Sequence, residues 1–169
     1  MSEISLRTFL PASAVFASGL ASGFLAAATC MDVPTFKELI AKKDADTIKK
    51  VFAIWWPFGG RFMIPITLFN AVAHFGSYAL TKESLWLVSG CFITANLPYT
   101  GIFMKKGIQA LRGKEKKLSD EEVYELTNSF CNLHQPRLFF ALLAFGISLY
   151  NVTKQKKLQT HLSIKYYLP

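Results

Sequence analysis

The sequence predicts an all-α integral membrane protein: a four-helix bundle with an additional amphipathic helix at the membrane interface. Two observations lead to this fold class. The 169 residues are 51% hydrophobic and 14% aromatic but only 18% charged, with a mean hydropathy of +0.28, whereas a soluble domain usually carries about 25% charged residues. The charges are also gathered in short stretches that separate four uncharged runs. We therefore expect a single membrane domain over residues 1–169.

The four uncharged runs cover residues 8–31, 62–81, 85–104 and 138–153. A helix needs about 20 mostly apolar residues to cross a hydrocarbon core about 30 Å thick, because its backbone polar groups must be satisfied within the segment. We therefore expect spanning helices at about 9–31, 61–81, 85–104 and 136–153. The first run is longer than the apolar core of a secretory signal, and it is interpreted as an uncleaved helix.

The first connection, residues 32–50, is charged, and its stretch 34–40 is expected to form a short interfacial helix. Trp55 and Trp56 suit a membrane interface, or they extend the second helix, with a kink at Pro57. Only three residues, 82–84, separate the second and third runs. The second and third spans are therefore expected to form an antiparallel hairpin.

The third connection, residues 105–135, contains its own helix signal. Ser119 and Glu122 have the spacing of a capping box, which predicts a helix at about 120–133. Val123, Leu126 and Phe130 fall on one face of it, so it is expected to lie on the membrane surface. Pro136 is expected to open the fourth span.

Topology follows from the basic residues. The first and third connections carry eleven of them, against six in the termini and the short hairpin. The positive-inside bias then places the charged connections in the cytoplasm, in an internal membrane such as the endoplasmic reticulum. The net charge of +8 is thus assigned to loops at a lipid bilayer, and no nucleic-acid partner is expected.

Polar side chains recur inside the predicted spans. Asn70 and His74 share a face of the second span with Thr67 and Ser77, Asn96, Tyr99 and Thr100 lie late in the third, and His134 and Arg137 stand at the start of the fourth. Polar groups in hydrocarbon are costly and tend to be functional. Two readings stay open: these residues line a ligand site, or they hold the helices together, with Arg137 reaching out to the headgroups.

Other chemistries lack sequence support. The chain contains no H-E-x-x-H, P-loop or G-x-S-x-G motif, which are the usual signs of metal hydrolysis, nucleotide binding and serine chemistry. Two intramembrane histidines could ligate a haem, but no spacing supports this. No metal and no cofactor are predicted, and Cys30, Cys91 and Cys131 are interpreted as small apolar residues.

The layout resembles the anthrone oxygenase-like family of small four-span membrane proteins. The resemblance covers about residues 13–150, and it rests on a small-residue first span leading to Pro34, the pair Trp55-Trp56, the segment 96–104 and Arg137. In that segment Pro98, Tyr99, Thr100 and Met104 fit the family's aromatic-Thr…Met pattern, and Leu111 fits its closing Leu. The chain departs from the pattern at Lys106, Ile108, Phe130 and His134.

The resemblance implies a monooxygenase that needs no cofactor, with dioxygen as co-substrate and a flat aromatic polyketide of the anthrone type as substrate. It implies a base, for which we expect His74, with Asn70 and Asn96 orienting an oxyanion or peroxide and Arg137 as cationic partner. Trp55, Trp56, Tyr99, Thr100 and His134 are expected to line the substrate cavity.

The alternative is a non-enzymatic membrane protein: a lipid-binding protein, an assembly factor, or an accessory subunit of a homo-oligomer or larger membrane complex. Its basic loops would then contact anionic lipids or a partner, and its polar stripe would be structural.

Overall fold

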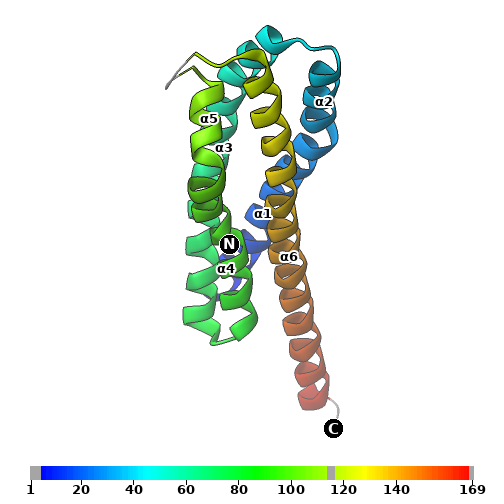
Figure 1. Ribbon diagram of the computed structural model, residues 1–169. Coiled ribbons are helices and arrows are strands. Elements are labelled where there is room, and N and C mark those ends of the chain that lie inside the picture. The colour runs from blue at the N-terminus through cyan, green and yellow to red at the C-terminus, as the bar shows by residue number, and fades with distance from the viewer. Residues whose placement is uncertain (1–4, 114–116, 168–169) are drawn as a thin grey trace.

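The computed structural model of the protein describes residues 5–113 and 117–167, with 157–167 described by their backbone alone. Within this range the chain forms helices and no strand. Four helical stretches are long and apolar enough to cross a membrane: Leu6–Ala41, Ala45–Thr81, Ser84–Leu111 and Asp120–Lys156. They stand side by side as one bundle (Figure 1). The all-α class and the four apolar helices predicted from the sequence are therefore confirmed.

The first stretch contains three helical segments without a loop between them. Helix α1 (Leu6–Ala27) continues through a π-helical turn, η1 (Ala28–Asp32), into α2 (Val33–Ala41). Pro34 lies just after η1 and has no backbone N–H for the regular helical ladder. A local π-helical turn is one way in which a helix accommodates such a defect. The predicted first connection is therefore mostly helical, and only residues 42–44 separate α2 from α3.

Helix α3 (Ala45–Thr81) is the longer member of a hairpin with α4 (Ser84–Tyr99). Asp44 caps α3 by accepting a hydrogen bond from the Thr47 backbone amide at 3.0 Å, and hydrogen bonds from the side chain and backbone of Thr47 lower the pKa of Asp44. Lys82, with a φ of 59°, ends α3 in the left-handed conformation. The hairpin predicted for residues 82–84 is present.

A second π-helical turn, η2 (Thr100–Met104), joins α4 to α5 (Lys105–Leu111). Here the proline comes first, because Pro98 lies two residues before the turn. The segment that the sequence assigns to a loop thus continues the third helix well beyond the predicted end of the span.

Helix α6 (Asp120–Tyr167) differs from expectation. The capping box is present: the Glu122 amide donates to Ser119 Oγ at 3.3 Å, and the Ser119 amide donates to Glu122 Oε2 at 2.9 Å. The helix then continues through Pro136 into the fourth span, so residues 120–133 form no separate helix lying on the membrane surface. The reason is packing, because Val123 and Phe130 are buried against α2, α3 and α5 rather than turned toward lipid.

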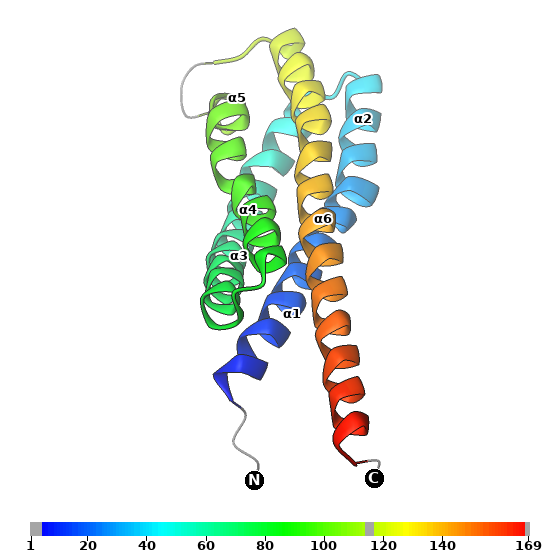
Figure 2. The same ribbon diagram turned by 90° about the horizontal axis from the view of Figure 1, so that it is seen from below.

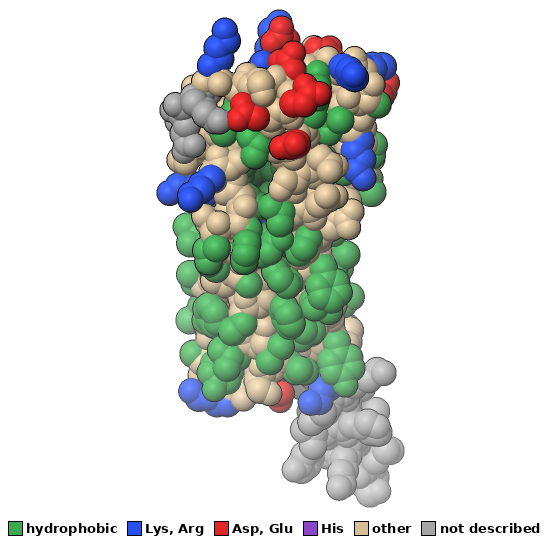
Figure 3. Space-filling model, in the orientation of Figure 1, with side chains coloured by type: hydrophobic (Ala, Val, Ile, Leu, Met, Phe, Trp, Pro, Cys, Tyr) green, Lys and Arg blue, Asp and Glu red, His purple; other side chains and the backbone are tan. Residues whose placement is uncertain are grey.

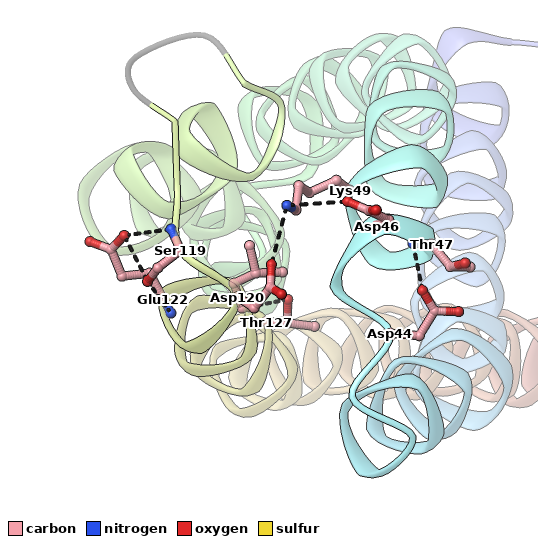
Figure 4. A network of polar contacts seen from close by, with 9 residues as sticks. Asp44, Asp46, Thr47, Lys49, Ser119, Asp120, Glu122 and Thr127 are labelled. Atoms are coloured by element: carbon pink, nitrogen blue, oxygen red, sulfur yellow. Dashed lines mark hydrogen bonds and ion pairs between the residues drawn. The ribbon is translucent and has the colours of Figure 1, made fainter.

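Two layers of packing result. At the end of the bundle that carries the charged connections, α2, α5 and the first parts of α3 and α6 enclose an aromatic-rich core, here called the cap layer (Figure 1). The remaining part, the membrane layer, has smaller cores built on alanines such as Ala21 and Ala144. Lys49 ties the cap layer together, with its Nζ 3.4 Å from Asp46 and 3.6 Å from Asp120 (Figure 4).

The surface follows the same division. A broad apolar band surrounds the membrane layer, and charged side chains gather at the two ends (Figure 3). Large hydrophobic side chains in this band, among them Phe16, Val72 and Phe139, are more than half exposed. Helix α1 begins and α6 ends at the same end of the molecule (Figure 2). These features suit a bundle that crosses a bilayer with its cap layer on one side.

Candidate functional site

A cavity of about 340 Å³ lies where the cap layer meets the membrane layer. Its walls come from the middle of α3, from the end of α4 with η2 and α5, and from α6, and Phe24 of α1 also contributes. This volume is at the lower end of the range for small-molecule sites, about 300–1,000 Å³. The cavity therefore has room for a small molecule.

One wall of the cavity is aromatic. Trp55 and Trp56 both line it, and each also contacts another side chain of the protein. Trp55 Nε1 donates a hydrogen bond to Asp32 Oδ2 at 2.9 Å, and the Trp56 ring stacks on Phe52 with an interplanar angle of 4°. These tryptophans belong to the cap-layer packing as well as to the cavity, and their rings, tilted by 48° to each other, present two aromatic surfaces to a ligand.

The cavity wall also carries buried polar residues. Asn96, His134 and Arg137 line it and are only 4%, 1% and 7% exposed. Within the described part of the chain, Asn96 Oδ1, His134 Nε2 and Arg137 Nε have no hydrogen-bond partner. Leaving such groups unpaired costs free energy, roughly 1–3 kcal/mol each and more for a charged group. All three atoms are themselves almost inaccessible, so a ligand in the cavity would reach them only after these side chains move.

Arg137 is the most unusual of the three. Its guanidinium has five N–H donors, yet its side-chain hydrogen bond to His134 is a long one, from Nη1 to Nδ1 at 3.5 Å. Its Cζ lies 6.0 Å from the centre of the Trp56 ring, at the outer limit of a cation–π contact. None of the ion pairs among the described residues involves it. It is thus a buried cation with no protein carboxylate beside it.

The Arg137 contact also indicates a tautomer for His134. Arginine can only donate, so His134 Nδ1 accepts, and a neutral ring then carries its proton on Nε2. Asn96 Nδ2 donates to the Ile93 carbonyl oxygen at 3.3 Å, which leaves Asn96 Oδ1 as a free acceptor. The polar side of the cavity therefore offers two donors and one acceptor.

The π-helical turn η2 positions the third wall. Thr100 and Gly101, the first residues of η2, both line the cavity, and Thr100 Oγ1 donates to the Asn96 carbonyl oxygen at 2.8 Å. A Cβ atom added at Gly101 would meet no atom within 4 Å, so the wall is open at this point. π-helical turns are frequent at functional sites because they displace the helix that follows.

The structure brings together six of the nine residues predicted for the site: Trp55, Trp56, Asn96, Thr100, His134 and Arg137. It does not bring in Tyr99, whose ring lies 5.0 Å from that of Phe103 and 5.9 Å from that of Phe140. Asn70 and His74 lie outside the cavity lining, deeper in the membrane layer.

Asn70 and His74 belong to a separate buried polar cluster. Ser18 of α1 donates to Asn70 Oδ1 at 3.1 Å, and His74 Nδ1 lies 2.8 Å from the Asn70 carbonyl oxygen. His74 Nε2 lies 2.7 Å from Ser148 Oγ of α6. Both ring nitrogens of His74 are therefore engaged with protein. The polar stripe predicted on α3 is present, and this part of it links helices.

Several cavity residues escaped the sequence analysis. Lys105, Gln109 and Arg112 line the cavity from α5 and its end, but the sequence assigns all three to a connection, where Lys105 and Arg112 count only toward the topology. Their spacing of four and three residues places them on one helix face, which is the signal that could have identified them. Gly59 and Gly60 in the α3 wall gave no such signal.

The described residues define an all-helical protein with four membrane-length helices and a cavity that has both aromatic and buried polar residues in its wall. Among the described residues, no group of three or more His, Cys, Asp or Glu side chains is placed to hold a metal ion. Comparison of the chain with protein-family models, curated proteins and solved structures finds no match.

Proposed function

We propose that the protein is an integral membrane oxygenase of the anthrone type, which binds a flat hydroxylated aromatic molecule as its anion and oxidises it with dioxygen without a resident cofactor. The observation that carries this proposal is the set of Asn96, His134 and Arg137: three buried side chains with unpaired polar atoms, lining a cavity with a tryptophan wall.

The reaction needs an environment that favours the substrate anion. An anthrone has a CH₂ group between two aromatic rings, and loss of a proton there gives an anion delocalised onto the ring oxygen. The carbanion combines with dioxygen to form a C–O bond, and protonation gives a hydroperoxide. Loss of the remaining hydrogen with cleavage of the O–O bond releases water and leaves the quinone carbonyl. The products are one quinone and one water, with dioxygen as the only oxidant.

Each polar residue has a role in this scheme. Arg137 and the Nε2–H of His134 stabilise the oxyanion, as donors in a site sheltered from water do in other enzymes. Asn96 Oδ1 accepts a hydrogen bond from a neighbouring phenol and so orients the rings. The first proton passes to water at the side of the cavity where Gly101 and Lys105 are exposed. The flat substrate stacks on one of the two tryptophan rings, which are tilted by 48° to each other, and meets the other at an angle.

His74 has no role in this proposal, although the sequence suggested it as the base. It is absent from the cavity lining, and its nitrogens face the Asn70 carbonyl and Ser148. A base must come within hydrogen-bond reach of the proton that it removes. We therefore assign the chemistry to the pair on α6.

The apolar band implies residence in a bilayer, where a greasy aromatic substrate would also concentrate. We propose that the cap layer faces the cytoplasm of an internal membrane such as the endoplasmic reticulum, because eleven basic residues belong to the two connections at that end.

The experiment is an oxidation assay on the full chain in lipid nanodiscs. A dihydroxyanthrone is supplied, and dioxygen consumption and quinone absorbance are followed against empty nanodiscs. We expect quinone formation well above the spontaneous rate and a loss of roughly 10²-fold or more in Arg137→Gln. Lys106→Gln is the control, because Lys106 is exposed and lies outside the cavity lining. A rate equal to that of empty nanodiscs would reject the oxygenase.

A further inference from the structure

The α5 side of the cavity has a chemistry of its own. Lys105, Gln109 and Arg112 lie at successive turns of one helix face, and all three line the cavity. Lys105 is exposed and Arg112 is half-buried, whereas Arg137 across the cavity is buried. The cavity therefore has a deep polar end at α6 and a rim at α5.

The charges around the cavity are all of one sign. Its lining contains Lys105, Arg112 and Arg137 but no aspartate or glutamate. The ion pairs of the described residues join Lys42 to Glu38 and Lys49 to Asp46 and Asp120, so no rim cation takes part in one. Three cations around a low-dielectric cavity create a strong positive potential, and no carboxylate among the described residues forms an ion pair with them.

The two positions for an anion are distinct. Arg137 acts at the deep end, where it serves the oxyanion of the reacting ring. Arg112 and Lys105 are more exposed and come from α5 and its end, so they form a second cationic position in the cavity wall. An arginine presents a planar fork that matches a carboxylate, and Gln109 between the two cations adds a neutral donor. The rim thus has the composition of a carboxylate-binding subsite.

We propose that the rim formed by Lys105, Gln109 and Arg112 is an acid-recognition subsite, and that the natural ligand is an aromatic carboxylic acid whose carboxylate stays at the rim while its hydroxylated ring reaches Arg137. This proposal rests on the proposed function for the position of the ring. The rim selects the substrate, and the deep end reacts with it. The same cations could instead hold the phosphate of an anionic lipid, and the experiment separates the two sources.

The test measures binding, so it does not depend on turnover. Full-length protein is placed in nanodiscs of phosphatidylcholine alone, and quenching of the Trp55 and Trp56 fluorescence reports the occupied cavity. The probes are a dihydroxyanthraquinone and the same compound with a carboxylic acid group on one outer ring. Neither probe can be oxidised at the position where an anthrone reacts.

We expect the acid to bind at least about 10-fold more tightly than the neutral probe. The double variant Lys105→Gln/Arg112→Gln should lose this preference and keep its affinity for the neutral probe. Lys106→Gln, which removes an exposed cation of α5 outside the lining, should behave as wild type. Arg137→Gln should weaken the binding of both probes. Equal binding of the two probes by the wild-type protein would overturn the acid-recognition subsite, even if anthrone oxidation were observed.

A second set of nanodiscs contains phosphatidylglycerol. If the rim recognises the ligand, the preference for the acid should persist there. If the anionic lipid abolishes the preference, the rim holds lipid headgroups and the proposal is wrong. A preference for the acid in a protein that oxidises no anthrone would support the subsite and reject the oxygenase, so the two failures can be told apart.

Discussion

His74 on α3 and Ser148 on α6 form a polar contact inside the membrane layer, with His74 Nε2 2.7 Å from Ser148 Oγ and both side chains fully buried. The other ring nitrogen must donate to the Asn70 carbonyl at 2.8 Å, because a carbonyl can only accept. Ser148 Oγ also lies 2.6 Å from the Ala144 carbonyl oxygen, so its single proton has two acceptors within reach, that oxygen and His74 Nε2. Both ring nitrogens of His74 therefore have partners within the protein, and the side chain links two helices.

This relationship predicts that His74 matters for stability and not for ligand binding. His74→Gln should lower the thermal unfolding midpoint in detergent while the affinity for the anthraquinone probe changes by less than about twofold. A double-mutant cycle with Ser148→Ala should give a coupling of about 0.6–1.5 kcal/mol, the range for polar contacts between membrane helices. If His74→Gln gave a stable protein that no longer oxidises anthrone, the prediction would be wrong and His74 would be the catalytic base.

Arg137 should show the opposite behaviour. A buried cation without a carboxylate partner destabilises the fold, and replacing buried charges by apolar residues is often stabilising by about 1–4 kcal/mol. We therefore predict that Arg137→Met raises the unfolding midpoint while ligand binding falls by roughly 10-fold or more. Thermal unfolding with and without the probe measures both effects. If Arg137 served only to hold helices together, Arg137→Met would instead lower the unfolding midpoint of the protein.

The contact between α3 and α4 depends on Gly90. A Cβ atom at this position would lie 3.0 Å from His74 Cβ and 3.0 Å from Phe75 Cε1, and overpacking of this kind costs about 1–3 kcal/mol. Gly90→Ala should therefore lower the unfolding midpoint. Gly23→Ala is the matched control, since its new methyl group would meet no atom within 4 Å. Removing the conformational freedom of that glycine should stabilise α1 slightly. Equal effects of the two substitutions would show that α3 and α4 are not this close.

The sequence predicts the membrane layer better than the cap layer, for a physical reason. Uncharged runs identify spanning helices because charge is excluded from hydrocarbon whatever the tertiary contacts are. An apolar helix face such as that of Val123 and Phe130, by contrast, is equally compatible with lipid and with protein. The sequence does not say which of them covers the face, and in this protein it is protein, Phe36 and Phe52 included.

The same limit applies to the polar residues. The spacing of Asn70 and His74 correctly places them on an interior face of α3. Whether such a side chain meets a cavity or a partner depends on residues that are distant in sequence: Ser18 and Ser148 in their case. His134 and Arg137 share a helix face in the same way, but they meet a cavity because η2 and α5 do not fill the space beside them.

The packing of α6 in the cap layer gives the last prediction. Phe130 is 4% exposed and lies among the rings of Phe36, Phe52, Trp55 and Trp56, whereas Phe139, farther along the same helix, is 58% exposed. Phe130→Ala should destabilise the protein by about 3–5 kcal/mol, the usual cost of removing a buried phenylalanine. It should also loosen the packing of Trp55 and Trp56 and weaken the binding of the anthraquinone probe.

Phe139→Ala removes the same atoms from a lipid-facing position, and it should leave both the unfolding midpoint and the probe affinity close to wild type. The comparison separates the continuous helix from the surface-lying helix that the sequence suggests. A surface-lying helix would turn Phe130 toward lipid, and the two substitutions would then have equally small effects on the unfolding midpoint. Thermal unfolding in one detergent decides between them, because the two residues share chemistry and helix and differ only in what covers them.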